Sequence, residues 1–346
     1  MRLPPTASRT DVKPLAALLL SLLAILAALA LGAAFGETAI PIGTVARTAA
    51  NHLFGAGLAV DPIDAGIVWD YRLARAVVAA CCGAALALSG VVLQALLRNA
   101  LADPYVLGIS AGASTGAVAV AILGVGGGFV SLSAGAFVGA VTAFGCVLLL
   151  ARAAGSGPTA AILAGIAGSQ LFNALTAFIV TRSANAETAR GIMFWLLGNL
   201  SGVRWADVTL AFPIALLGTL VCLWQIRALD AFTFGADAAA SLGVAIRPVQ
   251  AVLIGAATLM TAVMVSLVGS IGFVGLVIPH AARFLVGARH GRLVPASAVL
   301  GAVFLVACDI ASRMVVPKQV VPIGIVTALI GAPAFAIILI RARRLS

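Results

Sequence analysis

The stretch GAALALSGVVLQALLRNALADPYVLGISAGAS, residues 83–114, places a short polar turn between two long apolar runs. Arg98, Asn99 and Asp103 lie in that turn, and Gly and Ser recur after it. A helix needs about 20 apolar residues to cross a hydrocarbon core of about 30 Å. The stretch therefore predicts the end of one spanning helix, a turn at the membrane surface, and the next helix.

The whole chain of 346 residues has the same character, with 62% hydrophobic and 9% charged residues. Soluble domains have about 45–50% apolar and about 25% charged residues, and lack the interior to bury so many apolar side chains. We predict a single all-α membrane domain over residues 1–346. The ten predicted spans are residues 14–36, 73–97, 105–125, 129–151, 159–181, 206–226, 248–268, 271–287, 294–312 and 320–340.

The basic residues are unevenly divided between the two sides of these spans. Thirteen of the 21 Lys and Arg residues fall on the side of the N-terminus, which the positive-inside rule assigns to the cytoplasm. This topology explains the net charge of +10 without nucleic acid as a partner. We therefore expect both termini in the cytoplasm.

The chain lacks the motifs that several functional classes need. The lysines, Lys13 and Lys318, lie in no phosphate-binding loop, so the chain cannot be its own P-loop ATPase. Histidines stand far apart without a metal-ligand or nucleophile motif, which disfavours an enzyme or a metal site. An ion-coupled secondary transporter stays open, although the acids fall at span ends rather than at mid-membrane.

Small residues follow the polar turn at a spacing of four, at Gly108, Gly112 and Gly116. Such residues let two membrane helices approach closely, so we predict helix packing at all three. In the turn itself, Asn99 and Asp103 are typical helix-capping residues, and Pro104 suits the first turn of a helix.

Sequence blocks along the chain resemble the FecCD/BtuC family, the permease subunits of type II ABC importers for iron–siderophore complexes, haem and vitamin B12. The blocks are YRLAR at 71–75, the opening stretch at 83–114, GSIGFVGLVIPHAARFLVGARHGRLVP at 269–295, CDIASR at 308–313 and PIGIVTALIGAPAF at 322–335. The resemblance implies a BtuC-like fold in a bacterial inner membrane, with short periplasmic and coupling helices. It also implies a homodimer with two ATPase subunits, which bind ATP and Mg, and a periplasmic binding protein.

Three arginines match family positions that bind glutamates on the two lobes of the binding protein. Arg72 and Arg75 are three residues apart, hence on one helix face, at the outer end of the second span. Arg313 lies at the outer end of the ninth span. Snorkelling towards the interface would also explain each arginine singly. With the family match, we expect docking contacts at all three.

Residues 229–250, LDAFTFGADAAASLGVAIRPVQ, join spans six and seven on the inner side. The resemblance implies a coupling loop of short helices that seats in a cleft on the ATPase. Its predicted contacts are Ala238, Ala239, Ala240 and Gly243, where glycine permits a tight turn. This chain has Ala where the family has an acidic residue in the run. Composition alone would also suit a solvated amphipathic loop.

The resemblance makes the opening turn part of a cytoplasmic gate. The matching residues are Asn99 and Leu101, with Pro158 and Thr159 from the turn between spans four and five. Ala100 stands where the family usually has proline, so the fixed backbone angle of proline is missing.

The cargo is predicted to be haem or another iron chelate, with a ferric siderophore or cobalamin as alternatives. No cofactor is expected on this chain itself, and His280 is assigned a structural role rather than haem ligation. Residues 40–54 and 184–205 are predicted to form short elements on the periplasmic surface.

Overall fold

Apolar helices make up most of this computed structural model, which describes residues 12–36, 38, 40–155, 157–183, 185–317 and 319–343. Each predicted span contains a helix, so the all-α fold class is confirmed within these residues. The helices that match the spans are α1 (Val12–Ala34), α4 (Ala74–Leu96), α5 (Ile109–Leu123), α6 (Leu132–Ala153), α7 (Pro158–Thr181), α9 (Trp205–Trp224), α12 (Ile246–Val268), α13 (Val274–Val286), α14 (His290–Met314) and α15 (Ile323–Arg343). The remaining elements are α2 (Ile42–Phe54), α3 (Pro62–Gly66), the π-helical segment η1 (Ile67–Leu73), the 3₁₀ turn η2 (Pro104–Leu107), α8 (Ala186–Leu196), α10 (Ile226–Phe232) and α11 (Ala236–Ser241).

The helices differ in their capacity to cross a membrane. Among the described residues, 7 helices are long and apolar enough, and α5, α13 and the apolar part of α15 are shorter. With 15 residues, α5 is about 22 Å long, which is less than a hydrocarbon core. The number of crossings therefore stays a prediction.

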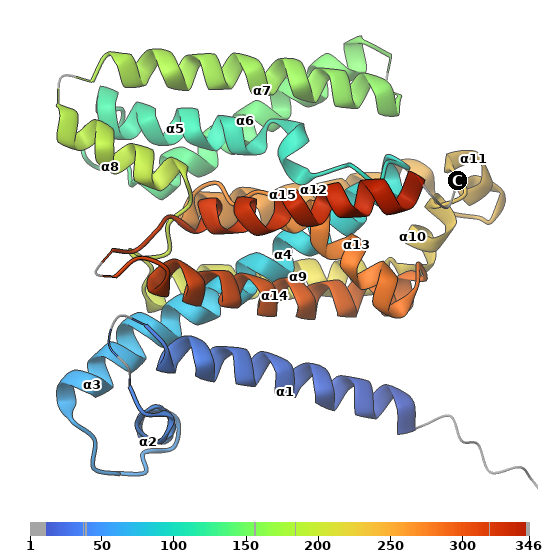
Figure 1. Cartoon of the computed structure of the whole chain (residues 1–346). Helices are drawn as coiled ribbons and strands as arrows, with labels where there is room; N and C mark the ends of the chain where they lie inside the picture. Colours follow the sequence, from blue (N-terminus) through green and yellow to red (C-terminus); the bar gives the residue numbers. More distant parts are fainter. Residues whose placement is uncertain are drawn as a thin grey trace, which may run out of the picture.

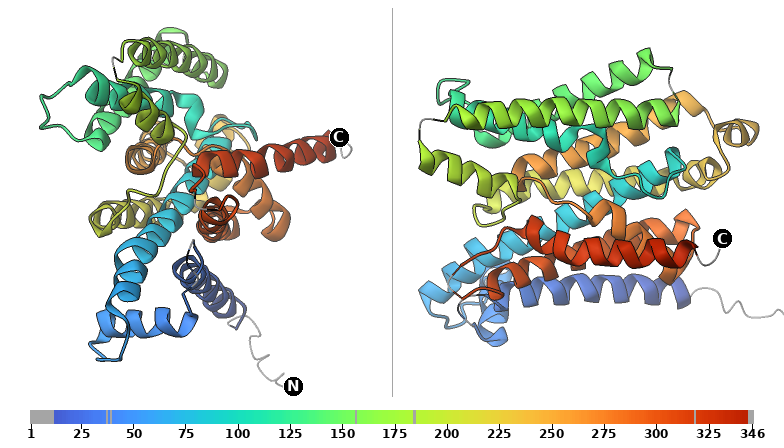
Figure 2. Two further views of the ribbon diagram at one scale, coloured as in Figure 1. Left: turned by 60° about the vertical axis from the view of Figure 1, so that its left-hand side comes forward. Right: turned by 45° about the horizontal axis from the view of Figure 1, so that its top comes forward.

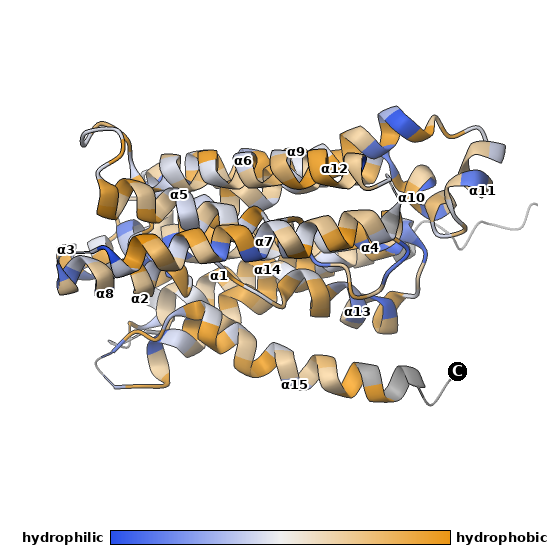
Figure 3. Cartoon of the chain, turned by 90° about the horizontal axis from the view of Figure 1, so that it is seen from above, coloured by the Kyte–Doolittle hydropathy of each residue, from blue (hydrophilic) through white to orange (hydrophobic). Residues whose placement is uncertain are grey.

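The short helices lie at the two ends of the bundle (Figure 1). At one end are α2, α3 and α8, and at the other are α10 and α11; we call these the α8 end and the α11 end. The right view of Figure 2 shows the same separation. In Figure 3, apolar residues run along the helices and polar residues gather near both ends, as expected for a membrane protein.

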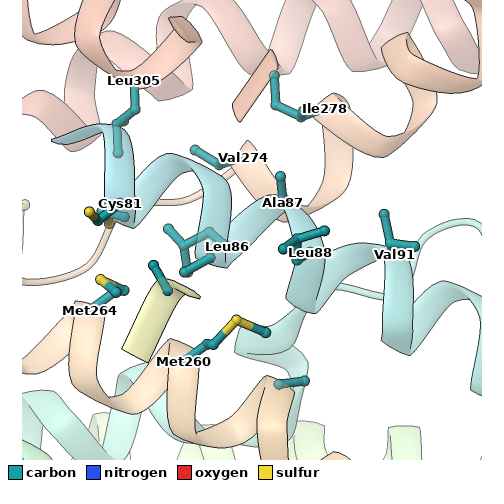
Figure 4. Packing of buried hydrophobic residues seen from close by; sticks show 14 of the residues in the cluster. Cys81, Leu86, Ala87, Leu88, Val91, Met260, Met264, Val274, Ile278 and Leu305 are labelled. Carbon is teal, nitrogen blue, oxygen red and sulfur yellow. The ribbon is translucent and has the colours of Figure 1, made fainter. Parts of the chain in front are cut away.

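The centre of the bundle is α4, which packs against α9, α12, α13 and α14. Leu86 of α4 is buried together with Met260 and Met264 of α12 (Figure 4). Val274 and Leu305 bury the opposite side of α4 from α13 and α14. Helices at the periphery, such as α1 and α9, leave most of their apolar residues exposed, which suits contact with lipid.

Glycines set the closest helix contacts. A methyl group on Gly83 would lie 2.0 Å from the carbonyl oxygen of Gly301, so α4 and α14 meet backbone to backbone. The same holds between α5 and α6, where Gly112 and Gly116 face Gly139 and Gly135, and the packing prediction for these two residues is confirmed.

Gly108 packs against α6 as predicted, since its Cβ would lie 3.2 Å from Val147 Cγ2, and it has a second role as well. It lies between η2 and α5 with a φ of 77°, a left-handed conformation that glycine adopts at little cost. The turn at Gly108 delays the start of α5 to Ile109, whereas the predicted span began at residue 105.

Gly116→Leu should leave little folded protein, because its Cβ would lie 2.0 Å from the carbonyl oxygen of Gly135 on α6. Gly145→Leu is the matched control, since its Cβ meets nothing within 4 Å. Size-exclusion chromatography and thermal melting in detergent would compare the two variants. Equal yields and melting temperatures would contradict the packing account.

Candidate functional site

The three predicted docking arginines lie at the α8 end, where Arg75 and Arg313 bind Asp309 of α14. Asp309 is 0% exposed, and Arg75 Nε donates to its Oδ1 at 2.6 Å. Arg313 Nη2 lies 2.9 Å from Asp309 Oδ2. A single carboxylate is thus held between guanidinium groups from α4 and α14. We call Arg72, Arg75, Arg313 and Asp309 the arginine cluster.

Two of the arginines also bind backbone carbonyl groups at the end of α1. Arg72 Nη1 donates to the carbonyl oxygen of Ala34 at 2.8 Å, and Arg313 Nη2 donates to that of Gly32 at 3.0 Å. The last carbonyls of a helix have no partner within the helix, so these guanidinium groups satisfy them. The cluster therefore joins α1 to η1 and α14.

The arginine cluster is buried and carries a surplus of positive charge, since it contains three guanidinium groups and one carboxylate. Arg72, Arg75 and Arg313 are 7%, 8% and 6% exposed. The hydrogen-bond partners described above lie within the chain, and the docking contacts stay a prediction. Sequence reasoning missed the role of Asp309, although its spacing of four from Arg313 places the two on one helix face.

The turn after α4 holds the first pair of predicted gate residues. Asn99 Oδ1 accepts from the N–H of Leu101 at 2.9 Å, and Asp103 Oδ1 accepts from that of Tyr105 at 2.8 Å. Asn99 and Asp103 thus bond to the backbone two residues ahead, and Pro104 opens η2. The capping prediction is therefore confirmed for Asp103. Burial raises the pKa of Asp103 to about 6, against the opposing effect of the Tyr105 N–H.

This gate turn, residues 98–104, is tied to the link between α12 and α13. Tyr105 follows the turn, and its hydroxyl oxygen accepts from the N–H of Ile271 at 2.9 Å. Leu101 is 48% exposed at the tip of the turn. An exposed apolar side chain on a turn that is held in place suits a residue that packs against another gate segment.

The second pair of predicted gate residues lies on a neighbouring element. Pro158 begins α7, and Thr159 lines a hollow of about 500 Å³ between the ends of α6 and α7. Gly165, further along α7, packs so closely on η2 that its Cβ would lie 1.9 Å from the carbonyl oxygen of Val106. The two parts of the predicted gate therefore share one supporting contact.

The predicted coupling loop forms two short helices, α10 and α11, at the α11 end. Of the predicted contacts in α11, Ala239 is buried, while Ala238 is half-buried and Ala240 is exposed. Gly243 ends the loop with a φ of 82°.

Large apolar side chains on either side of α11 face outward. Phe234 is 75% exposed and Leu242 is 71% exposed. The surface around α11 therefore combines exposed large apolar side chains with the small side chains of the alanines. This combination suits a protein partner.

A pocket that the sequence did not reveal lies between α5, α7, α8 and the link after α12, with a volume of about 540 Å³. Its polar lining consists of Ser110, Ser114, Asn173, Thr176, Thr181 and Ser270. Ser110 and Ser270 share a hydrogen bond of 2.8 Å between their hydroxyl groups. The described lining residues carry no charge. We call this the hydroxyl pocket.

Comparison with known proteins identifies the family. The sequence profile of the FecCD transport family matches residues 20–341. The chain belongs to the FecCD transport family. Together with the apolar helices, this makes it a multi-pass membrane permease of the FecCD type.

FecCD relatives with curated names cover most of the chain. The uncharacterized ABC transporter permease protein YvrB of Bacillus subtilis is 40% identical over 321 residues, covering 91% of this chain and 90% of that protein. The cobalamin import system permease protein BtuC of Halobacterium salinarum is 42% identical over 280 residues, covering 79% and 73%. The Fe(3+) dicitrate transport system permease protein FecD of Escherichia coli is 35% identical over 277 residues, covering 80% and 86%.

The fold of this FecCD chain also matches a solved structure. An ABC transporter assigned to the metal-chelate type, in an inward-facing conformation, superposes with a TM-score of 0.81 at 29% identity. The match covers 94% of this chain and 99% of the other.

Proposed function

We propose that this chain is the permease subunit of an ABC importer that passes an iron chelate or cobalamin from a periplasmic binding protein into the cytoplasm. The observation that carries the proposal is the FecCD match over residues 20–341. Named relatives carry cobalamin and iron(III) dicitrate, which supports this range of cargo. Haem stays our first prediction within that range, and a ferric siderophore or cobalamin is the alternative.

The energy source in this proposal is a partner. The permease is not itself an enzyme; two copies of it would join two ATPase subunits that bind ATP and Mg. We place the complex in a bacterial inner membrane, with the α8 end in the periplasm and the α11 end and both termini in the cytoplasm. The ATPase would contact Ala238, Ala239, Ala240 and Gly243 in the coupling loop.

The path in this proposal begins in the hydroxyl pocket, because α8 and the end of α7 line it on the periplasmic side. Hydroxyl and amide groups exchange hydrogen bonds with a polar cargo, but form no ion pair that would hold it strongly. The path would end at the gate residues Asn99, Leu101, Pro158 and Thr159. ATP shifts such gates only if it binds one conformation of the complex more tightly than another.

Cargo binding by the cognate binding protein tests the proposal and separates its alternatives. Titration calorimetry with haem, a ferric siderophore and cobalamin would identify the cargo, and labelled uptake into proteoliposomes would follow it through the complex. We expect one of the three to bind and to be taken up. If none is bound or transported, the proposed cargo range is wrong.

Arg72, whose guanidinium group binds the carbonyl oxygen of Ala34, offers a test of docking. Arg72→Gln should weaken docking of the binding protein about tenfold at low salt, and the difference should shrink at high salt as charges are screened. Arg152→Gln, at the α11 end, is the control. An unchanged Kd in a folded Arg72→Gln variant would remove Arg72 from the docking surface.

A further inference from the structure

Arg98, the first residue of the gate turn, has an unusual backbone. Its φ is 47°, and within the described residues only Phe273 shares a positive φ among residues other than glycine. Side chains make this left-handed conformation unfavourable, so it persists where the surroundings hold it. Arg98 is exposed at this position.

The guanidinium group of Arg98 reaches the coupling loop. A methyl group placed on Gly235 would lie 3.3 Å from Arg98 Nη1 and 3.8 Å from Arg98 Cζ. Gly235 is buried between α10 and α11, with a φ of 106°. The Arg98 side chain therefore lies against the residue that joins α10 and α11, although the two residues are 137 positions apart in the sequence.

The other side of the coupling loop is fixed. Asp230 of α10 accepts from the backbone N–H of His290 at 2.9 Å, and its Oδ1 lies 2.8 Å from His290 Nδ1. His290 is 2% exposed at the start of α14. Asp230 thus anchors α10 to α14, while α11 projects beyond the bundle (Figure 1). Because α10 is held in place by Asp230, a movement of α11 would displace Gly235, the residue between the two helices.

We propose that Arg98 is a positioning residue that passes movement of the coupling loop to the gate residues Asn99 and Leu101. The proposal rests on the function proposed above, since it needs an ATPase at α11. Contact with Gly235 moves Arg98, and Arg98 is joined by one peptide bond to Asn99. Because the guanidinium group of Arg98 lies against Gly235, a shift of Gly235 displaces the gate turn as well.

Transport and ATP hydrolysis, measured together on the full complex in proteoliposomes, test this proposal. We expect Arg98→Ala to lower the cargo transported per ATP hydrolysed by about tenfold, while ATP hydrolysis stays within about twofold of the wild type. Arg98→Gly should have the same defect, because it removes the contact but favours the backbone conformation. Arg98→Lys should retain part of the coupling. Arg152→Ala, an exposed arginine at the same end but outside the coupling loop, is the control.

Two outcomes would overturn the proposal: normal transport per ATP in Arg98→Ala and Arg98→Gly, or an equal fall of transport and hydrolysis in both. If Arg98→Ala does not fold, Arg98→Gly decides alone, since it relieves the backbone strain. Failure of the proposed function is distinguishable, because the wild-type complex would then show no ATP-dependent uptake.

Discussion

Asp309→Asn should give the largest loss of stability of any single polar substitution in this chain. Removing one partner of a buried ion pair costs about 3–5 kcal/mol, because the other charge stays buried without compensation. Here two guanidinium groups, those of Arg75 and Arg313, would lose the same carboxylate. Thermal melting in detergent should show a fall of about 5–10 °C.

Asp70→Asn is the matched control, since it makes the same chemical change on an exposed residue at the α8 end. The double variant Arg75→Gln with Asp309→Asn should lose less melting temperature than the sum of the two single variants. The reason is that it also removes the charge of Arg75, which Asp309→Asn alone would leave without its carboxylate. If Asp309→Asn and Asp70→Asn have the same melting temperature, Asp309 does not hold the cluster together.

Gly243→Val should uncouple ATP hydrolysis from transport. A methyl group on Gly243 meets nothing within 4 Å, so the obstacle is the φ of 82°, which a β-branched residue adopts only with strain. The turn between α11 and α12 would change shape and move α11 relative to the bundle. We expect transport to fall at least about tenfold while hydrolysis persists.

Gly243→Asn separates backbone strain from the added side chain, because Asn tolerates the left-handed conformation. It should retain most of the transport that Gly243→Val loses, measured as cargo imported per ATP hydrolysed. Equal coupling in both variants would show that the turn at Gly243 does not set the position of α11.

The positions of the helices were predictable because apolar run length alone marks a membrane helix. The start of α5 was not, since Pro104 opens a separate 3₁₀ turn and Gly108 reverses the backbone before the helix begins. Apolar content cannot detect such a change, because residues 104–108 are as apolar as those of a helix.

The site was predictable only where its residues are close in sequence. The capping bond of Asp103 follows from local pattern, whereas the short coupling helices were expected from the family resemblance. The arginine cluster and the hydroxyl pocket join segments from opposite parts of the chain: Arg75 meets Asp309, and Ser110 meets Ser270. One sequence without tertiary contacts does not contain these pairings.

Uptake of cargo into proteoliposomes with the ATPase and the binding protein tests the central claim most directly. The rival is an ion-coupled secondary transporter, which would work without either partner. We predict that uptake requires ATP, the ATPase and the loaded binding protein, and that dissipating ion gradients has no effect. Uptake by the permease alone, driven by an ion gradient, would contradict the assignment as an ABC importer subunit.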